Sequence, residues 1–218
     1  MFRTLRIMKR LWETARLMAR NDALFSLKFF NLAPTFIWVI ELASKKSTSG
    51  RPGQRLARAL NEAGPSFIKL GQTLATRSDL LGEDLASDLS ELQDRLPPFS
   101  AAEARNAIEL EFNTPIEDIF KFFADEPVAA ASIAQVHFAV TKEGQEVAVK
   151  ILRPGIEEAF ARDLDLLHWL ANLIERARPD LRRLKLREVV NTLAKTVELE
   201  MDLRLEAAAA SELLENFK

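Results

Sequence analysis

The stretch Val136–Ile151, VHFAVTKEGQEVAVKI, decides the fold of this 218-residue chain. Apolar residues alternate with other residues on both sides of Gly144, and alternation with a period of two is typical of strands with one buried face. The alternating apolar residues are Val136, Phe138 and Val140 before the glycine and Val147, Val149 and Ile151 after it. The pattern predicts a β-hairpin that turns at Gly144.

The second strand of this hairpin separates two kinds of side chain. Its period places Ala148 and Lys150 on one face and the β-branched residues on the other. A small residue beside a lysine suits a flat base and a phosphate group. The alternative is that Lys150 is only a charge at the end of an edge strand, which is common for a tetrapeptide of this kind.

Upstream of the hairpin the chain is predicted to be helical. Apolar residues recur at helical spacing over residues 54–96, with breaks near Gly64-Pro65 and near Leu81-Gly82. Glycines and prolines are few, seven and nine in the chain, which also favours helix.

Two further helical regions flank the hairpin. Ser100 followed by Glu103 is a capping-box signature and predicts a helix over residues 101–112. After Pro154-Gly155, helices are expected to the end of the chain, with a break near Pro179. The predicted fold class is therefore α+β, mostly helical, with one small antiparallel sheet.

Composition excludes several kinds of site. The chain is 48% hydrophobic, so it can bury a core, and it has no cysteine. Disulfides, thiolate zinc sites and a cysteine nucleophile are therefore excluded. The two histidines, His137 and His168, are too few for a histidine-rich metal site, and we expect neither to act as a general base.

Charge is distributed unevenly. Residues 1–60 hold twelve Lys and Arg against three Asp and Glu, a charge of +9, so the rest of the chain carries −11 within the total of −2. This indicates an anionic partner for the N-terminal part, such as a lipid surface. A solvated helix face is the alternative. Nucleic acid is less favoured, because no motif that reads it is present.

Residues 3–20 are predicted to form a basic amphipathic helix of the kind that lies on membranes. Its apolar residues are Leu5, Ile7, Leu11, Trp12, Leu17 and Met18, and its basic residues are Arg3, Arg6, Lys9, Arg10, Arg16 and Arg20. The uncharged run 29–40 has only twelve residues, whereas a membrane span needs roughly 20. We expect that run to be interfacial or buried, and residues 44–53 to be a linker.

An alanine-rich stretch precedes the hairpin. Residues 129–137, AAASIAQVH, lie where a protein kinase carries the glycine-rich loop that covers the phosphates, and Lys150 lies where its strand lysine pairs them. A Cβ makes left-handed backbone costly, by about 1–2 kcal/mol per residue, so an alanine-built loop should be stiffer. The alternative is the start of an alanine-rich helix, which Pro127 and the following strand disfavour.

Four motifs in order resemble the UbiB family of atypical kinases. They are AAASIAQVH at 129–137, VAVK at 147–150, the KxGQ motif at 69–72 and an ExD motif at 200–202. The similarity covers about residues 54–218. The family's arginine after ExD is replaced by Leu205. The resemblance implies an atypical protein-kinase-like N-lobe, with a small antiparallel sheet and a long helix, and an N-terminal helical KxGQ extension.

The resemblance also implies roles for individual residues. Lys150 and Glu206 are expected to pair as the catalytic lysine and helix glutamate. Lys69 and Gln72 are expected to meet Glu200 and Asp202 and to guard the nucleotide cleft. The implied nucleotide-binding residues are Ala129, Ala130, Ala131, Ser132, Ile133, Ala134, Gln135, Val136, Ala148 and Lys150. Residues 200–206 are expected to lie on one helix, on which Asp202 and Glu206 share a face that Glu200 does not. Glu200 paired with Arg204 on the surface is the alternative.

The expected organisation is a basic membrane-proximal segment over 1–50, the KxGQ extension over 51–125 and the kinase-like N-lobe over 126–218. The cofactors implied by the resemblance are ATP and Mg²⁺, with the metal ligands in a C-lobe that these residues lack. The expected partners are a membrane surface, prenylated quinone-pathway lipids and other ubiquinone-biosynthesis proteins, with a homodimer left open.

Two functional hypotheses follow from these observations. In the first, the complete protein is an ATPase or kinase of ubiquinone biosynthesis at the cytoplasmic face of the bacterial inner membrane, and this part alone is inactive. In the second, it is a non-catalytic pseudokinase scaffold that binds membrane or lipid. A mitochondrial or plastid location stays open in both.

Overall fold

The computed structural model describes residues 2–24, 49–92 and 96–217. The chain divides into two compact units. The helical unit comprises Met1–Gln93 and Glu158–Val197, and the sheet unit comprises Asp94–Glu157 and Glu198–Lys218. This division differs from the three expected segments, because residues 94–125 belong with the sheet. The functional assignment of those segments stays a prediction.

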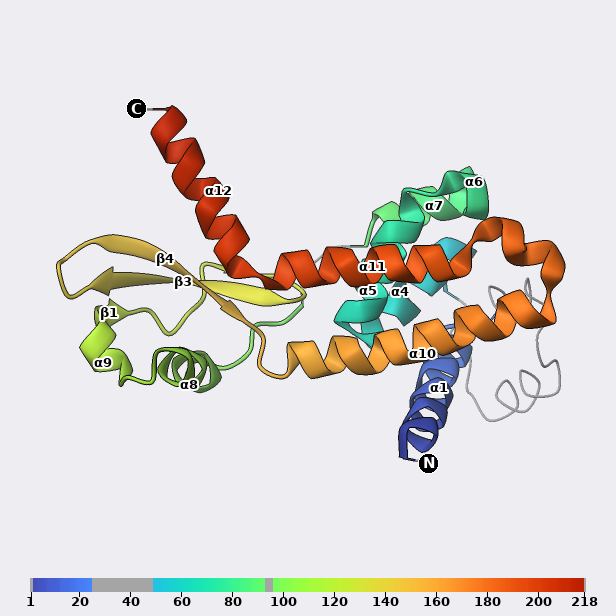
Figure 1. Ribbon diagram of the computed structural model, residues 1–218, viewed down its shortest axis with the longest axis horizontal. Coiled ribbons are helices and arrows are strands. Elements are labelled where there is room, and N and C mark those ends of the chain that lie inside the picture. Colours follow the sequence, from blue (N-terminus) through green and yellow to red (C-terminus); the bar gives the residue numbers. More distant parts are fainter. Residues whose placement is uncertain (1, 25–48, 93–95, 218) are drawn as a thin grey trace. The chain divides into compact units, whose positions relative to one another are not determined.

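The helical unit contains helices whose ends follow the glycines and prolines of the sequence (Figure 1). Gly64, at φ +110°, separates α4 from α5 and Pro65 opens α5, while Gly82, at φ +81°, separates α6 from α7. Both predicted breaks are confirmed. The elements are α1 (Phe2–Arg20), α4 (Pro52–Ala63), α5 (Pro65–Ala75), α6 (Ser78–Leu81), α7 (Glu83–Ser90), α10 (Ile156–Ala177), the 3₁₀ helix η1 (Pro179–Leu184) and α11 (Leu186–Met201).

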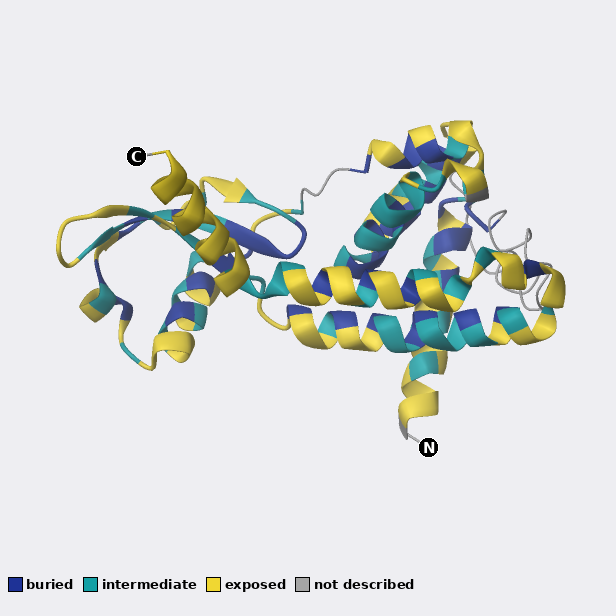
Figure 2. Ribbon diagram, turned by 45° about the horizontal axis from the view of Figure 1, so that its top comes forward, coloured by how far each residue is buried: buried dark blue, intermediate teal, exposed yellow. Residues whose placement is uncertain are grey.

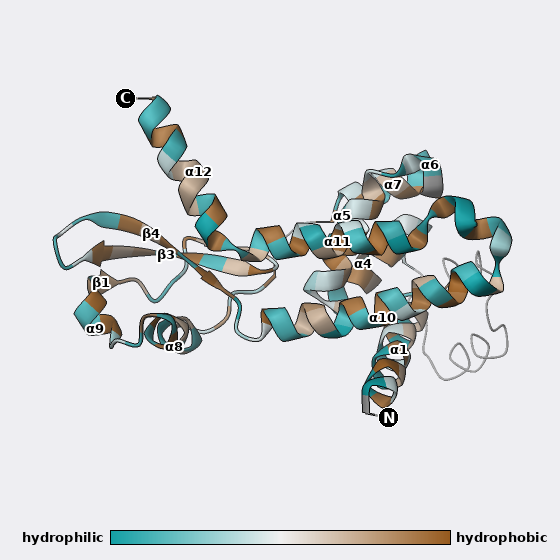
Figure 3. Ribbon diagram, viewed as in Figure 1, coloured by the Kyte–Doolittle hydropathy of each residue, from teal (hydrophilic) through white to brown (hydrophobic). Residues whose placement is uncertain are grey.

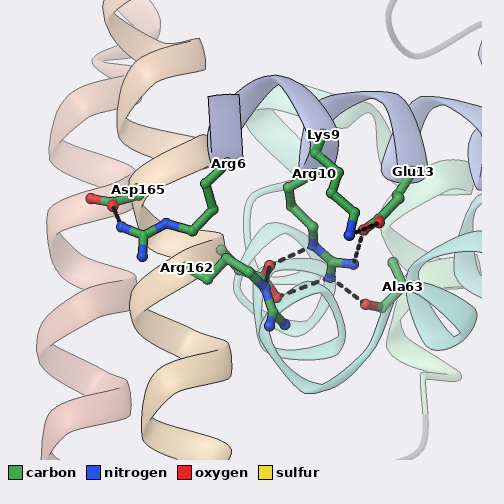
Figure 4. A network of polar contacts seen from close by, with 8 residues as sticks. Arg6, Lys9, Arg10, Glu13, Ala63, Arg162 and Asp165 are labelled. Carbon is green, nitrogen blue, oxygen red and sulfur yellow. Dashed lines mark hydrogen bonds and ion pairs between the residues drawn. The ribbon is translucent and has the colours of Figure 1, made fainter. Parts of the chain in front are cut away.

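Helix α1 is held in the helical unit by arginines that pair with acids of α10 (Figure 4). Arg10 donates from Nε to Asp163 Oδ1 at 2.6 Å and from Nη2 to the carbonyl of Ala63 at 2.8 Å, and its guanidinium lies 5.4 Å from the centre of the Phe67 ring. Arg3 Nη2 donates to Asp165 at 2.7 Å. The Asp163 side chain is only 2% exposed, so this pair lies inside the unit.

The amphipathic helix predicted for residues 3–20 is confirmed as α1. Its basic face, however, is turned largely toward acids of the same unit, since Arg6 also approaches Asp165 and Arg20 approaches Glu62, both at 3.6 Å. Charge counting alone could not show these partners. The interfacial run expected at 29–40 and residues 44–48 of the expected linker lie outside the described residues, and Pro52 and Gly53 at the end of that linker belong to α4. None of the described helices is long and apolar enough to cross a bilayer.

The sheet unit is built on the predicted hairpin. Strand β3 (Ala134–Thr141) pairs along its length with β4 (Glu146–Leu152), and its other edge pairs with β2 (Ala129–Ala130) near its start and with β1 (Phe120–Phe123) near its end, all antiparallel. Gly144, at φ +86°, lies in the turn. The hairpin and the small antiparallel sheet are therefore confirmed.

Helices α8 (Ala101–Phe112) and α9 (Ile116–Ile119) contribute to the core on one face of this sheet. Ser100 and Glu103 form the predicted capping box, with Ser100 Oγ accepting from the Glu103 N–H at 3.2 Å. The unit ends with α12 (Leu203–Asn216), which has no buried residue (Figure 2). The core residues are Phe99, Ala104, Ile108, Ile116, Phe120, Phe123, Ala139 and Ile151.

Candidate functional site

The open face of the sheet carries the predicted lysine. Val147 and Val149 pack toward the core with Ile151, which leaves Ala148 and Lys150 on the opposite face, as predicted. Across the β3–β4 ladder, Val136 is the partner of Lys150 and Phe138 is the partner of Ala148. Small and apolar side chains thus surround the base of one lysine on an accessible surface.

Lys150 is paired with a glutamate from the last helix. Its Nζ donates to Glu206 Oε2, and Glu206 lies in the first turn of α12, 56 residues further along the chain. The two side chains are 34% and 60% exposed. The pairing that the family resemblance implied is present, and its catalytic role stays a prediction.

The helix expected through residues 200–206 is interrupted, which corrects the rotational argument made from the sequence. Helix α11 ends at Met201, and Asp202, at φ −83° and ψ 85°, becomes the N-cap of α12. An aspartate is favoured at this position because its carboxylate accepts from free N–H groups of the first turn. Asp202 and Glu206 therefore do not share one continuous helix.

Asp202 is held by a neighbour on its own helix. Its carboxylate accepts from the N–H of Arg204 at 3.2 Å and from Arg204 Nε and Nη2, both at 2.8 Å. The Arg204 side chain, aided by its N–H and opposed by desolvation, holds the pKa of Asp202 below its usual range. Arg204, proposed as an alternative partner for Glu200, is thus paired with Asp202.

The KxGQ motif lies on α5, within the helical unit. Lys69 and Gln72 are half-buried and three residues apart on one continuous helix. Gly71 lies where α5 meets its neighbours, because a Cβ at this position would come within 2.4 Å of Leu92 Cδ1 and 2.8 Å of Leu60 Cδ1. The glycine of the motif thus permits close packing. The expected meeting of this motif with Glu200 and Asp202, which belong to the other unit, stays a prediction.

The alanine-rich stretch is mostly strand. Ala129 and Ala130 form β2, β3 begins at Ala134, and only residues 131–133 connect them. This excludes the alternative of an alanine-rich helix. The N–H of Ala131 donates to the carbonyl of Ala134 at 2.8 Å, which closes the turn. Ser132 is fully buried, and its hydroxyl has no hydrogen-bond partner in the structure.

The predicted nucleotide-binding residues differ in accessibility. Ser132, Ile133, Ala134 and Gln135 are buried as whole residues, so none of them presents a side chain at the surface. Val136 is half-buried on the same face as Lys150, and Ala148 is exposed. Their role in binding a nucleotide stays a prediction.

A network of buried hydrogen bonds lies on the core face of the sheet, and it was not predicted from the sequence. The Phe99 N–H donates to Gln135 Oε1 at 3.0 Å, Gln135 Nε2 donates to His137 Nε2 at 2.7 Å, and His137 Nδ1 donates to the carbonyl of Ala124 at 2.8 Å. These directions follow because a carbonyl can only accept, so Nδ1 carries the ring hydrogen. His137 is also stacked on Phe123, at 4.8 Å between ring centres. The period of β3, which places Gln135 and His137 on the face of Ala139, was the available signal.

The sequence of this chain matches known proteins. A family model described as the ABC1 atypical kinase-like domain matches residues 91–218. The chain belongs to this family. Its curated relatives include proteins named "Probable protein kinase UbiB" from Marinobacter nauticus, Azotobacter vinelandii and Pseudomonas fluorescens, with identities of 45%, 48% and 43%. The resemblance stated from the motifs is confirmed, and the chain is kinase-like in class.

These alignments cover most of the chain but a minority of each relative. They extend over 87%, 75% and 96% of the chain and over 34%, 30% and 40% of the three relatives, in the same order. A solved structure entitled "The complex structure of Rv3197-erythromycin from Mycobacterium tuberculosis" is 35% identical, with a TM-score of 0.45, over 64% of this chain and 34% of that one. The chain therefore spans about a third of the length of its family relatives.

Proposed function

We propose that this chain forms the nucleotide-binding part of an ATP-binding, kinase-like protein that supports ubiquinone biosynthesis at a membrane surface. The family supports the kinase-like class, and the name UbiB shared by the curated relatives supports the pathway. The relatives are bacterial, which supports a peripheral location at the cytoplasmic face of the inner membrane.

The Lys150–Glu206 pair carries this proposal. An ion pair that is this exposed contributes about 0–1 kcal/mol to stability, so the free energy of folding depends little on it. What the pair does provide is a positioned ammonium group on the open face of a sheet. A glutamate that fixes a strand lysine is the arrangement by which kinases present a cation to the α- and β-phosphates.

The surroundings of Lys150 fit the rest of a nucleotide. Ala148 offers no side chain beyond Cβ, so a flat base can approach the strand, and Val136 offers an apolar contact beside it. Lys150 Nζ would then hold the phosphates, with Glu206 fixing its direction. The residues present therefore fit ATP as the ligand.

Magnesium is assigned to no residue of this chain. The described ranges contain no group of three or more His, Cys, Asp or Glu side chains that could hold a metal ion. The chemistry that Mg²⁺ would supply, when bound, is positive charge that offsets the charge of the phosphates. The contribution of this chain is to position the nucleotide.

The KxGQ motif supports the proposal that protein substrates are excluded from the nucleotide cleft. We propose that Lys69 and Gln72 act with Glu200 and Asp202 to close the nucleotide cleft to protein substrates, so that ATP hydrolysis or self-directed transfer is the expected chemistry. Substitution of Lys69 and Gln72 by alanine in the complete protein should then raise phosphoryl transfer to an added protein acceptor. Unchanged transfer, with ATP binding intact, would contradict this part of the proposal.

ATP binding by the complete protein tests the proposal directly. Lys150→Ala and Glu206→Gln should each weaken binding of ATP, measured by isothermal titration in the presence of Mg²⁺. Lys121→Ala removes another exposed lysine of the same sheet, on β1, and should leave binding unchanged. Binding by the Lys150→Ala protein as tight as by the wild type would refute the nucleotide site.

The second hypothesis, a non-catalytic scaffold, shares the fold and the family. It predicts membrane or lipid binding without turnover of ATP. A complete protein that binds ATP but never releases phosphate under any lipid condition would favour the scaffold.

A further inference from the structure

We propose that one face of α1 docks on an anionic lipid bilayer, and that this face consists of Leu5, Met8 and Trp12 with Lys9 and Arg16 beside them. We call these five residues the α1 stripe. The inference rests on the proposed membrane role and deepens it, because it names the protein surface, the partner and the cations that bind the lipid headgroups.

The apolar part of the α1 stripe is exposed although its side chains are large. Leu5, Met8 and Trp12 are 60%, 45% and 43% exposed, whereas Ala15, Met18 and Ala19 further along the same helix are buried. Positions 5, 8 and 12 are three and four residues apart, so they lie on one face. Figure 3 shows hydrophobic and hydrophilic residues together along α1. The helix thus presents one apolar face to solvent.

The charged residues beside this apolar face indicate which partner binds it. Lys9 and Arg16 each lie one helical turn after an apolar member of the stripe, Leu5 and Trp12 respectively, and both are exposed. A tryptophan with neighbouring cations on an amphipathic helix is typical of helices that lie at the lipid headgroup level. The complementary partner is therefore a bilayer with anionic headgroups.

The other four cations of α1 have acidic partners on other helices. Lys9 differs from them, because its side chain is 81% exposed and its partner is Glu13 of α1 itself, at 3.9 Å. Arg3 and Arg10 donate to Asp165 and Asp163 of α10, and Arg20 approaches Glu62 of α4. These contacts fix the rotation of α1 about its own axis, so the stripe cannot turn inward without breaking the buried pair at Asp163. The membrane is thus expected to contact two cations of this helix, not six.

The sequence that follows α1 adds a second, independent observation. Residues 29–40 contain no charged residue and include Trp38. An uncharged run of twelve residues with a tryptophan is too short to span a bilayer and is compatible with its interface. Both features lie in the first 40 residues of the chain.

Vesicle flotation of the complete protein tests the surface. Vesicles of equal parts phosphatidylcholine and phosphatidylglycerol should bind the wild type. Serine at Leu5, Met8 or Trp12 should lower the partition coefficient about tenfold for each substitution, because apolar area is no longer buried. Leu110→Ser, at a leucine of α8 that is 73% exposed, is the matched control and should have no effect.

Neutral substitutions of Lys9 and Arg16 test whether these cations bind the lipid headgroups. Lys9→Gln and Arg16→Gln should each weaken binding to the anionic vesicles about fivefold and should not change binding to vesicles of phosphatidylcholine alone. Lys121→Gln controls for the loss of one positive charge elsewhere. Equal effects of all three substitutions would mean that Lys9 and Arg16 do not bind lipid headgroups. That result would overturn the assignment of the α1 stripe as the membrane-binding surface.

Trp12 supplies a readout without any change in the stripe. This chain contains Trp12, Trp38 and Trp169. A complete protein in which every tryptophan except Trp12 is replaced by phenylalanine therefore reports on Trp12 alone. Its emission should shift to shorter wavelength with anionic vesicles.

Wild type that binds no vesicle would overturn the membrane role itself. Binding that survives the three serines, or Trp12 emission that does not shift, would overturn only the stripe. A change in sedimentation mass of the serine variant without lipid would assign the stripe to a second copy and also overturn it.

Discussion

Two ion pairs join distant segments of this chain, and they differ in their surroundings. In the helical unit, Arg10 and Asp163 are 153 residues apart, and the carboxylate is 2% exposed and receives two bonds from the guanidinium. In the sheet unit, Lys150 and Glu206 are 56 residues apart, and both side chains are at least a third exposed. The first has hardly any contact with solvent, and the second is accessible to a ligand.

The difference in burial indicates that the two ion pairs have different roles. A buried carboxylate that loses its partner keeps its desolvation penalty, so the inner pair is required for the fold. The outer pair contributes little to folding, because water replaces either partner. The inner pair therefore attaches α1, and we propose that the outer pair serves ligand binding.

Removal of Arg10 should have the largest effect. Arg10→Met removes both hydrogen bonds to the buried Asp163 carboxylate and leaves it only the ion pair with Arg162, at 3.6 Å. It should lower the free energy of unfolding by up to about 3–5 kcal/mol, measured by urea denaturation. Arg16→Met removes an exposed arginine from the same helix and should change stability by less than about 0.5 kcal/mol. The double variant Arg10→Met with Asp163→Leu should recover most of the loss. Equal stabilities of the two single variants would show that the buried pair has no structural role.

Gly71→Ala should come next. The added Cβ meets Leu92 and Leu60 side chains that are closely packed, and overpacking of this kind costs about 1–3 kcal/mol. Leu92→Ala in the same protein removes the closest atom, so the two substitutions should be non-additive in urea denaturation. Additive losses would mean that the KxGQ glycine does not serve packing between helices.

The acid dependence of Asp202 should be smaller and has a definite sign. The pKa of this carboxyl is lower in the folded protein than in the unfolded chain, mainly through Arg204. Its ionised form therefore stabilises the protein above about pH 4, the ordinary value for aspartate, and this contribution is lost as the pH falls through the lower, folded value. Asp202→Asn keeps an N-cap acceptor and removes the charge. Its urea midpoint should lie below that of the wild type at neutral pH and should converge with it in acid; a constant difference would contradict the assignment.

Local features of the chain could be predicted from its sequence. Gly64-Pro65 and Leu81-Gly82 marked helix ends because left-handed backbone and a missing N–H act within a residue or two. The hairpin was visible because a period of two needs only its own residues. The candidate lysine and its glutamate came from the family motifs, and the structure shows them paired.

The features that could not be predicted depend on partners far away in sequence. Arg10 was interpreted as a lipid-facing charge, since nothing local identifies Asp163 as its partner. The predicted role of Gln135 at the nucleotide stays a prediction, but nothing local could identify the partner of its amide, which is the backbone of Phe99, 36 residues earlier. The interruption at Asp202 has no glycine or proline to mark it, only a residue type that favours caps.

The measurement that tests the central claim most directly is ATP binding by the Lys150→Ala protein together with its urea midpoint. We predict a midpoint within experimental error of the wild type, because the Lys150–Glu206 pair is exposed, and a loss of ATP binding, because the positioned ammonium group is gone. Lys150→Ala protein that binds ATP as tightly as the wild type would contradict the account.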